Sequence, residues 1–181
     1  IYFDEKINNR LRGVSRMDSL EIILERYEGK LLTMAEKVSL AEKKNQIYRE
    51  LLRTMTPEDV SEEVRDTLKK LHVDGFKLAI GSSSKNTKFI LEKVELIDAF
   101  DAVSDGTNIT RSKPDPEVFQ KAAKYLRVAP EECAVVEDAF AGIDAAKSGG
   151  MYAIGIGEAS KYEKADAHIE EFAELTEILE K

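Results

Sequence analysis

The second half of this chain alternates short apolar segments with helical ones, and this alternation limits the fold more than any other feature. Four segments are predicted to be buried strands: 76–81, 100–104, 134–137 and 152–156. Helices are predicted between or after them: 85–94, 116–127, 141–148 and 171–179. Short apolar strands that alternate with helices indicate a parallel sheet with helices on both faces. The expected fold class is therefore α/β over residues 58–181.

The first 57 residues show helical spacing and no strand pattern. One predicted helix face is made of four apolar residues: Leu20, Ile23, Leu24 and Tyr27. A second helix is expected over 33–53, where Thr33 and Glu36 have the spacing of a capping box. Pro57 favours a hinge followed by a helix to about residue 72. Residues 1–57 are thus predicted to form a small α-helical domain.

Composition narrows the class of partner. The chain is 43% hydrophobic and 34% charged, which is typical of a folded globular protein. Its formal net charge of −8 disfavours nucleic acid and anionic membranes, and no apolar run is long enough to span a bilayer. A single cysteine, Cys133, fits a reducing compartment. We expect a cytoplasmic protein with neither a nucleic-acid nor a membrane partner.

A hydroxyl-rich loop follows the first predicted strand. Ser82 follows this strand, and Ser83, Ser84, Lys85 and Asn86 come next, where a helix begins. Hydroxyls, free backbone N–H groups and a lysine at such a place can hold an anion such as phosphate. The alternative is that these serines only cap the helix.

Two further strand ends carry charged side chains. Lys113 lies between Ser112 and Pro114, and the prolines around it stiffen its backbone; the alternative is an ordinary surface lysine. Glu137 and Asp138 end an apolar strand, where adjacent carboxylates suit Mg²⁺ together with phosphate and water. The alternative is that Asp138 caps the next helix. Because ligands bind beyond the carboxyl ends of such strands, we expect these groups to meet.

These segments resemble a known superfamily. FKLAIGSSSKN, SKPDPEVF and VVEDAFAGIDAAKSGG are similar to the second, third and fourth motifs of the haloacid dehalogenase superfamily. The segments RGVSR, DSL and KKN resemble the cap of its β-phosphoglucomutase family. The resemblance implies a Rossmannoid α/β core at 58–181 and a helical cap at 1–57.

The resemblance also implies roles for individual residues. Ser82 and Lys113 would hold the transferring phosphoryl group, and Asp138 with Glu137 would bind Mg²⁺. The non-transferring phosphate would be held by four residues: Ser84, Lys85, Asn86 and Arg16. The sugar would be faced by four others: Gly13, Val14, Ser19 and Lys44.

The implied reaction interconverts β-D-glucose 1-phosphate and glucose 6-phosphate through a 1,6-bisphosphate and an aspartyl-phosphate enzyme. Its nucleophile and acid/base group form an Asp-x-Asp motif on a strand before the cap, but no aspartate in these 181 residues is followed two positions later by another. We therefore expect this segment upstream of Ile1, and we expect that the 181 residues alone do not form the phosphoenzyme. The alternatives are a sugar-phosphate phosphatase and a non-catalytic protein that binds a phosphosugar or a partner. A monomer acting on a small sugar phosphate is expected.

Overall fold

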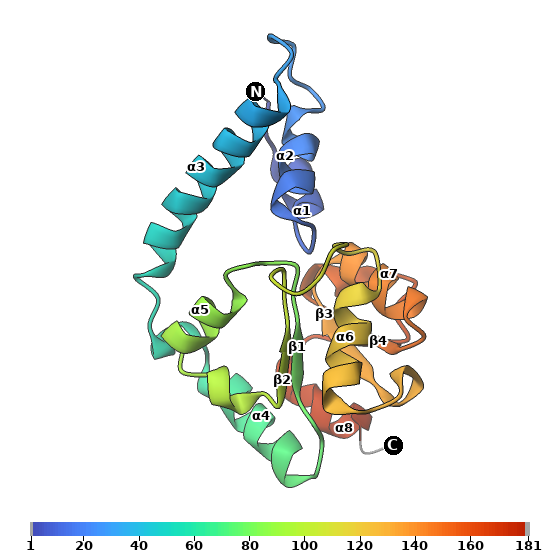
Figure 1. Cartoon of the computed structure of the whole chain (residues 1–181). Coiled ribbons are helices and arrows are strands. Elements are labelled where there is room, and N and C mark those ends of the chain that lie inside the picture. The colour runs from blue at the N-terminus through green and yellow to red at the C-terminus, as the bar shows by residue number, and fades with distance from the viewer. Residues whose placement is uncertain (1, 180–181) are drawn as a thin grey trace.

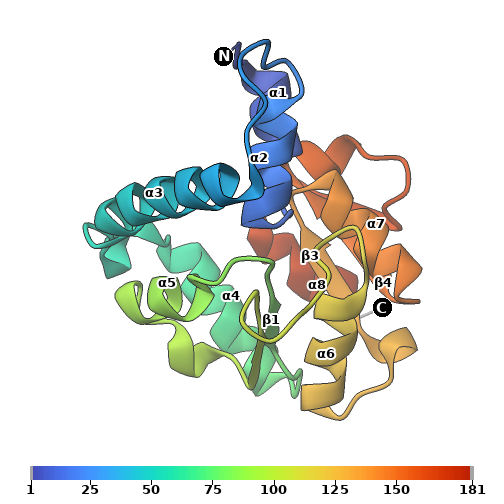
Figure 2. The same ribbon diagram turned by 45° about the horizontal axis from the view of Figure 1, so that its top comes forward.

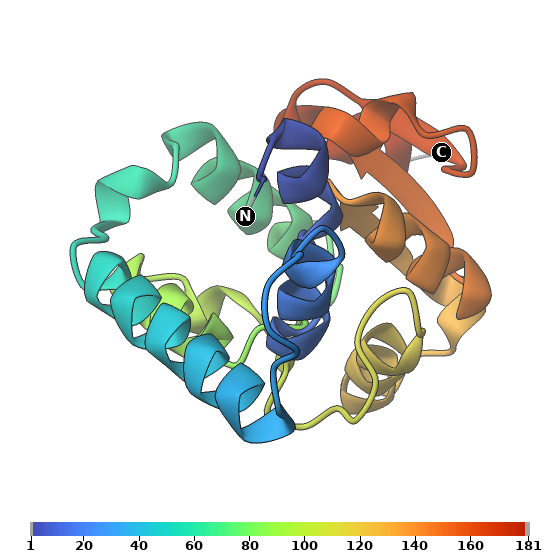
Figure 3. The ribbon, with the colours of Figure 1, turned by 90° about the horizontal axis from the view of Figure 1, so that it is seen from above.

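The computed structural model describes residues 2–179; Ile1, Glu180 and Lys181, which the predicted domain ranges include, lie outside it. Three helices precede residue 57: α1 (Glu5–Arg10), α2 (Arg16–Leu24) and α3 (Met34–Leu52). We call them the cap helices. Figure 1 shows α1 and α2 above the rest of the molecule, with α3 descending beside them toward α5 (Thr87–Lys93). Figure 3, seen from above, shows α3 to one side of α1 and α2. Whether the boundary between two domains falls at residue 57 stays a prediction.

The start of α3 was predicted correctly and the end of α2 was not. Thr33 accepts a hydrogen bond from the backbone N–H of Glu36, whose side chain accepts from the Thr33 N–H, so the capping box is present. The helix α2 ends at Leu24, and Tyr27 lies beyond it with 38% of its surface exposed. The predicted face that joined Leu20 to Tyr27 is therefore wrong at its last position.

The predicted helix over 57–72 is divided. A 3-10 turn at Pro57–Asp59 is followed by the extended residues Val60 and Ser61. The helix α4 (Glu62–Val73) then begins, because the Ser61 hydroxyl accepts a hydrogen bond from the Val64 N–H. Pro57 thus marks a turn before the helix rather than its first residue.

The remainder is an α/β unit, as predicted, with its strands in two parallel sheets. The strand β1 (Ala79–Gly81) pairs with β2 (Ala102–Ser104). A second sheet has the order β3 (Ala134–Glu137), β4 (Tyr152–Ile156) and β5 (Ala167–Ile169). Over the described residues no ladder joins β1 to β3, so the expected sheet is present as two pieces.

The strand β5 was not predicted, because its sequence lacks an apolar run. Only Ile169 of its three residues is buried, and His168 between its neighbours is exposed. Pairing with β4, which is buried at Ala153 and Ile154, defines this strand. Tertiary contacts therefore decide the structure where local pattern does not.

Helices cover both faces of the sheets, as expected. On one face, α6 (Glu117–Leu126) and α7 (Phe140–Ser148) pack through Val118 and Ile143, which are fully buried. On the other face, α8 (Leu175–Leu179) packs through Leu175 against Ile154 of β4, and α4 lies beside α8. Figure 2 shows these helices around the strands and α2 directed at the strand ends. Within residues 2–179, none of the helices combines the length and apolar character that crossing a bilayer requires.

Candidate phosphate-binding cleft

A cleft of about 400 Å³ lies between the cap helices and the carboxyl ends of the strands. Every site residue that the sequence predicted lines it: Gly13, Val14, Arg16, Ser19, Lys44, Ser82, Ser83, Ser84, Lys85, Asn86, Lys113, Glu137 and Asp138. These residues come from the loop between α1 and α2, from α2 and α3, from the loops after β1 and before α6, and from the end of β3. The fold thus gathers them in one place, whereas their roles toward a ligand stay predictions.

The serine loop after β1 is held by its own hydrogen bonds. The Ser82 hydroxyl accepts from the Ser84 N–H at 3.2 Å, and the Ser84 hydroxyl accepts from the Asn86 N–H at 3.1 Å. Each hydroxyl keeps its own proton for donation to a ligand. The helix α5 has Asn86 at its N-cap without a side-chain capping bond, so helix capping alone does not explain these serines.

Two residues of this loop also tie the core to the cap. The Ser83 hydroxyl donates to the carbonyl of Gly13 at 2.7 Å, and the Asn86 amide donates to Asn45 Oδ1 at 2.9 Å. Gly13 has φ of +74°, a left-handed conformation that favours glycine, and it lies directly against Lys113. Glycine is therefore favoured at this position by its backbone conformation alone, because a Cβ here would make only ordinary van der Waals contacts.

Two more contacts close the cap over the cleft. The Ser112 hydroxyl donates to Asp18 Oδ2 at 2.7 Å, and Arg12 reaches Asp138 Oδ2 at 3.4 Å. Hydrogen bonds from the hydroxyls of Ser15 and Ser112 lower the pKa of Asp18, so its carboxylate stays ionised. The Arg12–Asp138 pair is largely exposed and contributes little to stability.

Lys113 is buried, so the alternative of an ordinary surface lysine is wrong. Only 5% of it is exposed, and its Nζ bonds to Glu137 Oε1. The same ammonium lies 4.6 Å from the centre of the Phe119 ring, which packs closely over Gly81. A cation held over an aromatic face and against a carboxylate has a fixed direction. Phe119 and Glu137 thus determine where this charge lies in the cleft.

Glu137 and Asp138 differ sharply in environment. Glu137 is 9% exposed and its second oxygen accepts from the Ala139 N–H at 3.2 Å. Asp138 is exposed to the cleft, and Ala139 rather than Asp138 is the N-cap of α7. The alternative that Asp138 caps this helix is therefore wrong. Gly142 makes room for the Glu137 carboxylate, because a Cβ at this position would overlap it.

The acid pair has the chemistry of a magnesium site with few protein ligands. Among residues 2–179, no group of three or more His, Cys, Asp or Glu side chains converges in a way that could hold a metal. Mg²⁺ commonly takes one or two carboxylates and fills its other positions with water and phosphate. Asp138 lines the cleft, and its carboxylate already pairs with the guanidinium of Arg12. This carboxylate is therefore accessible to a positively charged group in the cleft.

Three lining residues were not predicted: Leu11, Asn45 and Tyr48. Tyr48 lies four positions after Lys44 on α3, and the helical spacing could have indicated it. Asn45 was noticed in the KKN segment, but its hydrogen bond to Asn86 depends on tertiary structure. Leu11 carries no chemical signal of its own.

A sequence model of the haloacid dehalogenase-like hydrolase family matches residues 5–150, which includes the cap helices and the three strand-end motifs. The chain belongs to this family.

Two proteins of known name are similar to this chain over most of its length. The chain is 42% identical over 178 residues to the β-phosphoglucomutase of Bacillus subtilis (strain 168), covering 97% of this chain and 78% of that protein. It is 30% identical to a phosphorylated carbohydrates phosphatase of Thermotoga maritima, covering 82% and 67%.

A solved structure supports the same membership. The crystal structure of a β-phosphoglucomutase from Clostridium difficile superimposes with a TM-score of 0.90 at 35% identity, over 99% of this chain and 82% of that one. The arrangement of the cap helices and the α/β core is therefore that of a haloacid dehalogenase-like fold.

Proposed function

We propose that this chain carries the sugar-phosphate site of a phosphomutase that interconverts β-D-glucose 1-phosphate and glucose 6-phosphate through a 1,6-bisphosphate and an aspartyl-phosphate enzyme. The observation that carries the proposal is the cleft, which brings core hydroxyls, a buried lysine and cap cations together. The 42% identity to a β-phosphoglucomutase supports the choice of reaction.

The core wall of the cleft would bind the transferring phosphoryl group. Ser82 would donate its free hydroxyl proton to a phosphoryl oxygen, and Lys113 would neutralise the charge that develops during transfer. Because Lys113 is fixed by Glu137 and Phe119, its ammonium needs little reorganisation when phosphate arrives. This rigidity favours catalysis over simple binding.

The cap wall would bind the second phosphate and the sugar. Among the described residues, Arg16, Lys44 and Lys85 form no ion pair with a protein carboxylate, although all three line the cleft. Arginine meets phosphate oxygens in pairs, which suits Arg16 as an anchor. An anchor on the cap would let either end of a bisphosphate be held while the other end reacts, and this is what distinguishes a mutase.

We propose Mg²⁺ as the cofactor, held by Asp138 with Glu137 completing its shell directly or through water. The ion would supply positive charge to the phosphoryl oxygens when bound. Asp138 is accessible from the cleft, and Glu137 is oriented by Lys113 and the Ala139 N–H. Cap contacts such as Ser83 with Gly13 would exclude water from the bound ester.

We also propose that the 181 residues by themselves bind substrate without forming the phosphoenzyme. They contain no Asp-x-Asp sequence. The two carboxylates of the cleft are already paired, Glu137 with Lys113 and Asp138 with Arg12. The protein would be a monomer of the cytoplasm that acts on a small sugar phosphate.

A sugar-phosphate phosphatase is the second candidate, and the 30% identity to a phosphorylated carbohydrates phosphatase favours it. It predicts phosphate release from many sugar phosphates and little mutase flux. A non-catalytic phosphosugar-binding protein predicts binding with no turnover, even when an Asp-x-Asp strand is supplied.

The test adds a strand ending in Asp-x-Asp ahead of Ile1 and compares this extended chain with the 181 residues. With β-D-glucose 1-phosphate, a trace of bisphosphate and Mg²⁺, ³¹P spectra measure glucose 6-phosphate and free phosphate together. We expect glucose 6-phosphate to dominate in the extended chain and no turnover in the original one. Dominant free phosphate would support the phosphatase, and absence of both products would refute a catalytic role.

Arg16→Ala in the extended chain separates the two enzymes. We expect mutase turnover to fall far more than hydrolysis of a simple phosphate ester, because such an ester has no second phosphate to anchor. Arg53→Ala is the matched control, since Arg53 is a cap arginine that pairs with Glu50 outside the cleft. Equal losses of both activities in Arg16→Ala would rule out the anchoring role.

A further inference from the structure

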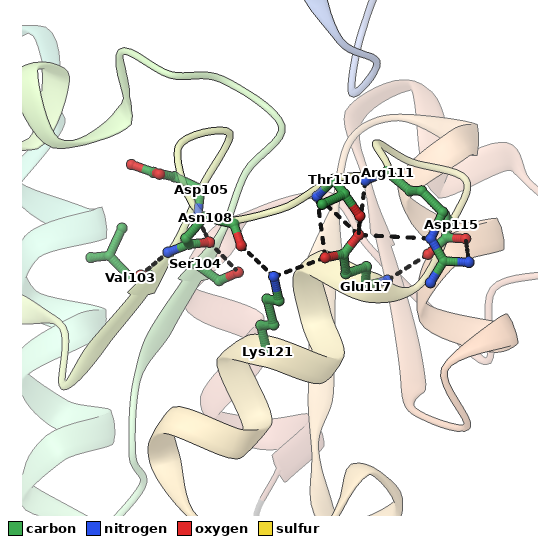
Figure 4. Close-up of polar contacts among 9 residues, drawn as sticks. All are labelled: Val103, Ser104, Asp105, Asn108, Thr110, Arg111, Asp115, Glu117 and Lys121. Atoms are coloured by element: carbon green, nitrogen blue, oxygen red, sulfur yellow. Dashed lines mark hydrogen bonds and ion pairs between the residues drawn. The ribbon is translucent and has the colours of Figure 1, made fainter.

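Glu117, in the first turn of α6, binds a loop rather than a ligand. It is 9% exposed, and its carboxylate accepts hydrogen bonds from the Thr110 N–H at 3.0 Å and the Arg111 N–H at 2.8 Å. It also accepts from the Thr110 hydroxyl at 2.8 Å and from Lys121 Nζ at 2.8 Å. Figure 4 shows these donors converging on the one carboxylate from two sides.

The loop held in this way runs from the end of β2 to α6. Its start is a turn in which the Asp105 N–H donates to Asn108 Oδ1 at 3.1 Å. Lys121 links this turn to Glu117, because its Nζ donates to the Asn108 carbonyl as well as to the carboxylate. The end of the loop is fixed where the Glu117 N–H donates to Asp115 Oδ1 at 2.9 Å. Glu117 therefore connects both halves of the loop to one helix.

The same loop places one group against the cap and another in the cleft. Ser112 and Lys113 follow directly after Arg111. The Ser112 hydroxyl bonds to Asp18 of the cap, and the Lys113 side chain enters the cleft and bonds to Glu137. Two peptide bonds thus separate the last backbone N–H held by Glu117 from the lysine predicted to meet phosphate.

Helix formation does not require this arrangement. A carboxylate in the first turn of a helix is usually stabilised by the helix's own N–H groups and dipole. Here the carboxylate instead accepts from Thr110 and Arg111 of another segment and from the Lys121 side chain. Burying an ionised group costs free energy unless such donors are present. Without Glu117, the backbone N–H groups of Thr110 and Arg111 would lose this acceptor.

We infer that Glu117 is a positioning residue that holds the loop 108–113, and through it the Lys113 ammonium, in the geometry needed to meet a phosphoryl group. This inference rests on the proposed function in one respect only, namely that Lys113 meets the phosphoryl group. Among the described residues, none of the hydrogen-bond partners of Glu117 lines the cleft, so its effect is transmitted by the backbone of the loop.

The test uses the 181-residue chain and three variants: Glu117→Ala, Glu117→Gln and the control Glu50→Gln. Glu50 is an exposed helix glutamate that pairs with Arg53, so its variant removes the same charge away from the loop. Two quantities are measured: acetylation of Lys113 by acetic anhydride, mapped by mass spectrometry, and amide exchange of Thr110 and Arg111. Amide exchange in β3 and β4 reports global opening.

We expect Lys113 in the original chain and in Glu50→Gln to be protected, because it is 5% exposed. In Glu117→Ala, acetylation and loop exchange should rise at least about tenfold, since charge-assisted hydrogen bonds are lost. Glu117→Gln should show a smaller rise, because its amide oxygen still accepts. Exchange in β3 and β4 should change far less than exchange in the loop.

Two results would overturn the inference. One is unchanged acetylation of Lys113 in Glu117→Ala, and the other is an equal rise in loop and strand exchange, which would mean a general loss of stability. Binding of glucose 6-phosphate to the original chain is measured alongside by calorimetry. If that binding is absent, the proposed function fails, whereas the acetylation and exchange results still decide the role of Glu117.

Discussion

Lys113 and Glu137 form a buried pair of opposite charges in the wall of the cleft, and each neutralises the charge of the other. Lys113 is 5% exposed and Glu137 is 9% exposed. The sequence could place Glu137 at a strand end, because an apolar strand precedes it, and Lys113 in a stiff segment, because two prolines follow it. Their direct bond could not be predicted, since it depends on how the loop before α6 lies against β3.

Lys113→Met should destabilise the protein by about 3–5 kcal/mol, because it leaves the Glu137 carboxylate buried without its cation. The free energy of unfolding in urea is the measurement. Lys69→Met is the matched control, since Lys69 pairs with Asp66 on the exposed surface of α4. Combining Lys113→Met with Glu137→Gln should recover part of the loss. Equal effects of Lys113→Met and Lys69→Met would contradict the account.

Gly142→Ala should destabilise the protein, although alanine normally favours a helix by up to about 1 kcal/mol over glycine. The added Cβ would overlap the Glu137 carboxylate, which Lys113 and the Ala139 N–H hold in place. Forcing this group aside should cost about 1–3 kcal/mol, as overpacking typically does. Thermal unfolding measures the sign, and a stabilised Gly142→Ala variant would show that Glu137 moves freely.

At the scale of elements, the sequence correctly predicted helix starts and strands that depend on neighbouring residues in the chain. The capping box of Thr33 and Glu36 fixes the start of α3, and apolar runs identify β3 and β4. The sequence failed where tertiary contacts decide, as at β5, which exists through its pairing with β4. It also failed at Tyr27, where spacing continued but the helix had ended.

Thr33→Ala should weaken the start of α3 by about 0.5–2 kcal/mol, because the Glu36 N–H loses its acceptor. Amide exchange over the first turn of α3 is the local measurement. Thr54→Ala is the control at the other end, where the threonine hydroxyl donates to the Leu51 carbonyl rather than capping an N-terminus. A larger effect at Thr54 than at Thr33 would refute the capping argument.

The loop held by α6 should respond to acid. The hydrogen bond from Lys121, with those from Arg111 and Thr110, lowers the pKa of Glu117 from its ordinary 4.5 to about 2. A lowered pKa gives stability that is present above pH 4.5 and lost as pH falls toward 2. The difference in unfolding free energy between the original chain and Glu117→Gln should therefore be constant above pH 4.5 and shrink below it. A difference that does not change with pH would contradict the lowered pKa.

At the scale of the whole molecule, the cleft exists because the cap helices meet the ends of two sheets. Ser83 with Gly13, and Ser112 with Asp18, join segments about 70 and 94 residues apart in the sequence. Such contacts explain why the motifs could be predicted separately but Leu11, which carries no chemical signal, could not be assigned to the cleft wall. The predicted site residues line this cleft.

The most direct test of the central claim is a titration of the 181-residue chain with β-D-glucose 1,6-bisphosphate, followed by backbone amide shifts. We predict shifts on both walls of the cleft, at Ser82–Asn86 in the core and around Arg16 in the cap, with none caused by glucose. Arg16→Ala should lose the cap shifts and keep those of the serine loop, whereas Arg53→Ala should keep both. Absence of shifts, or shifts confined to residues outside the cleft, would contradict the account.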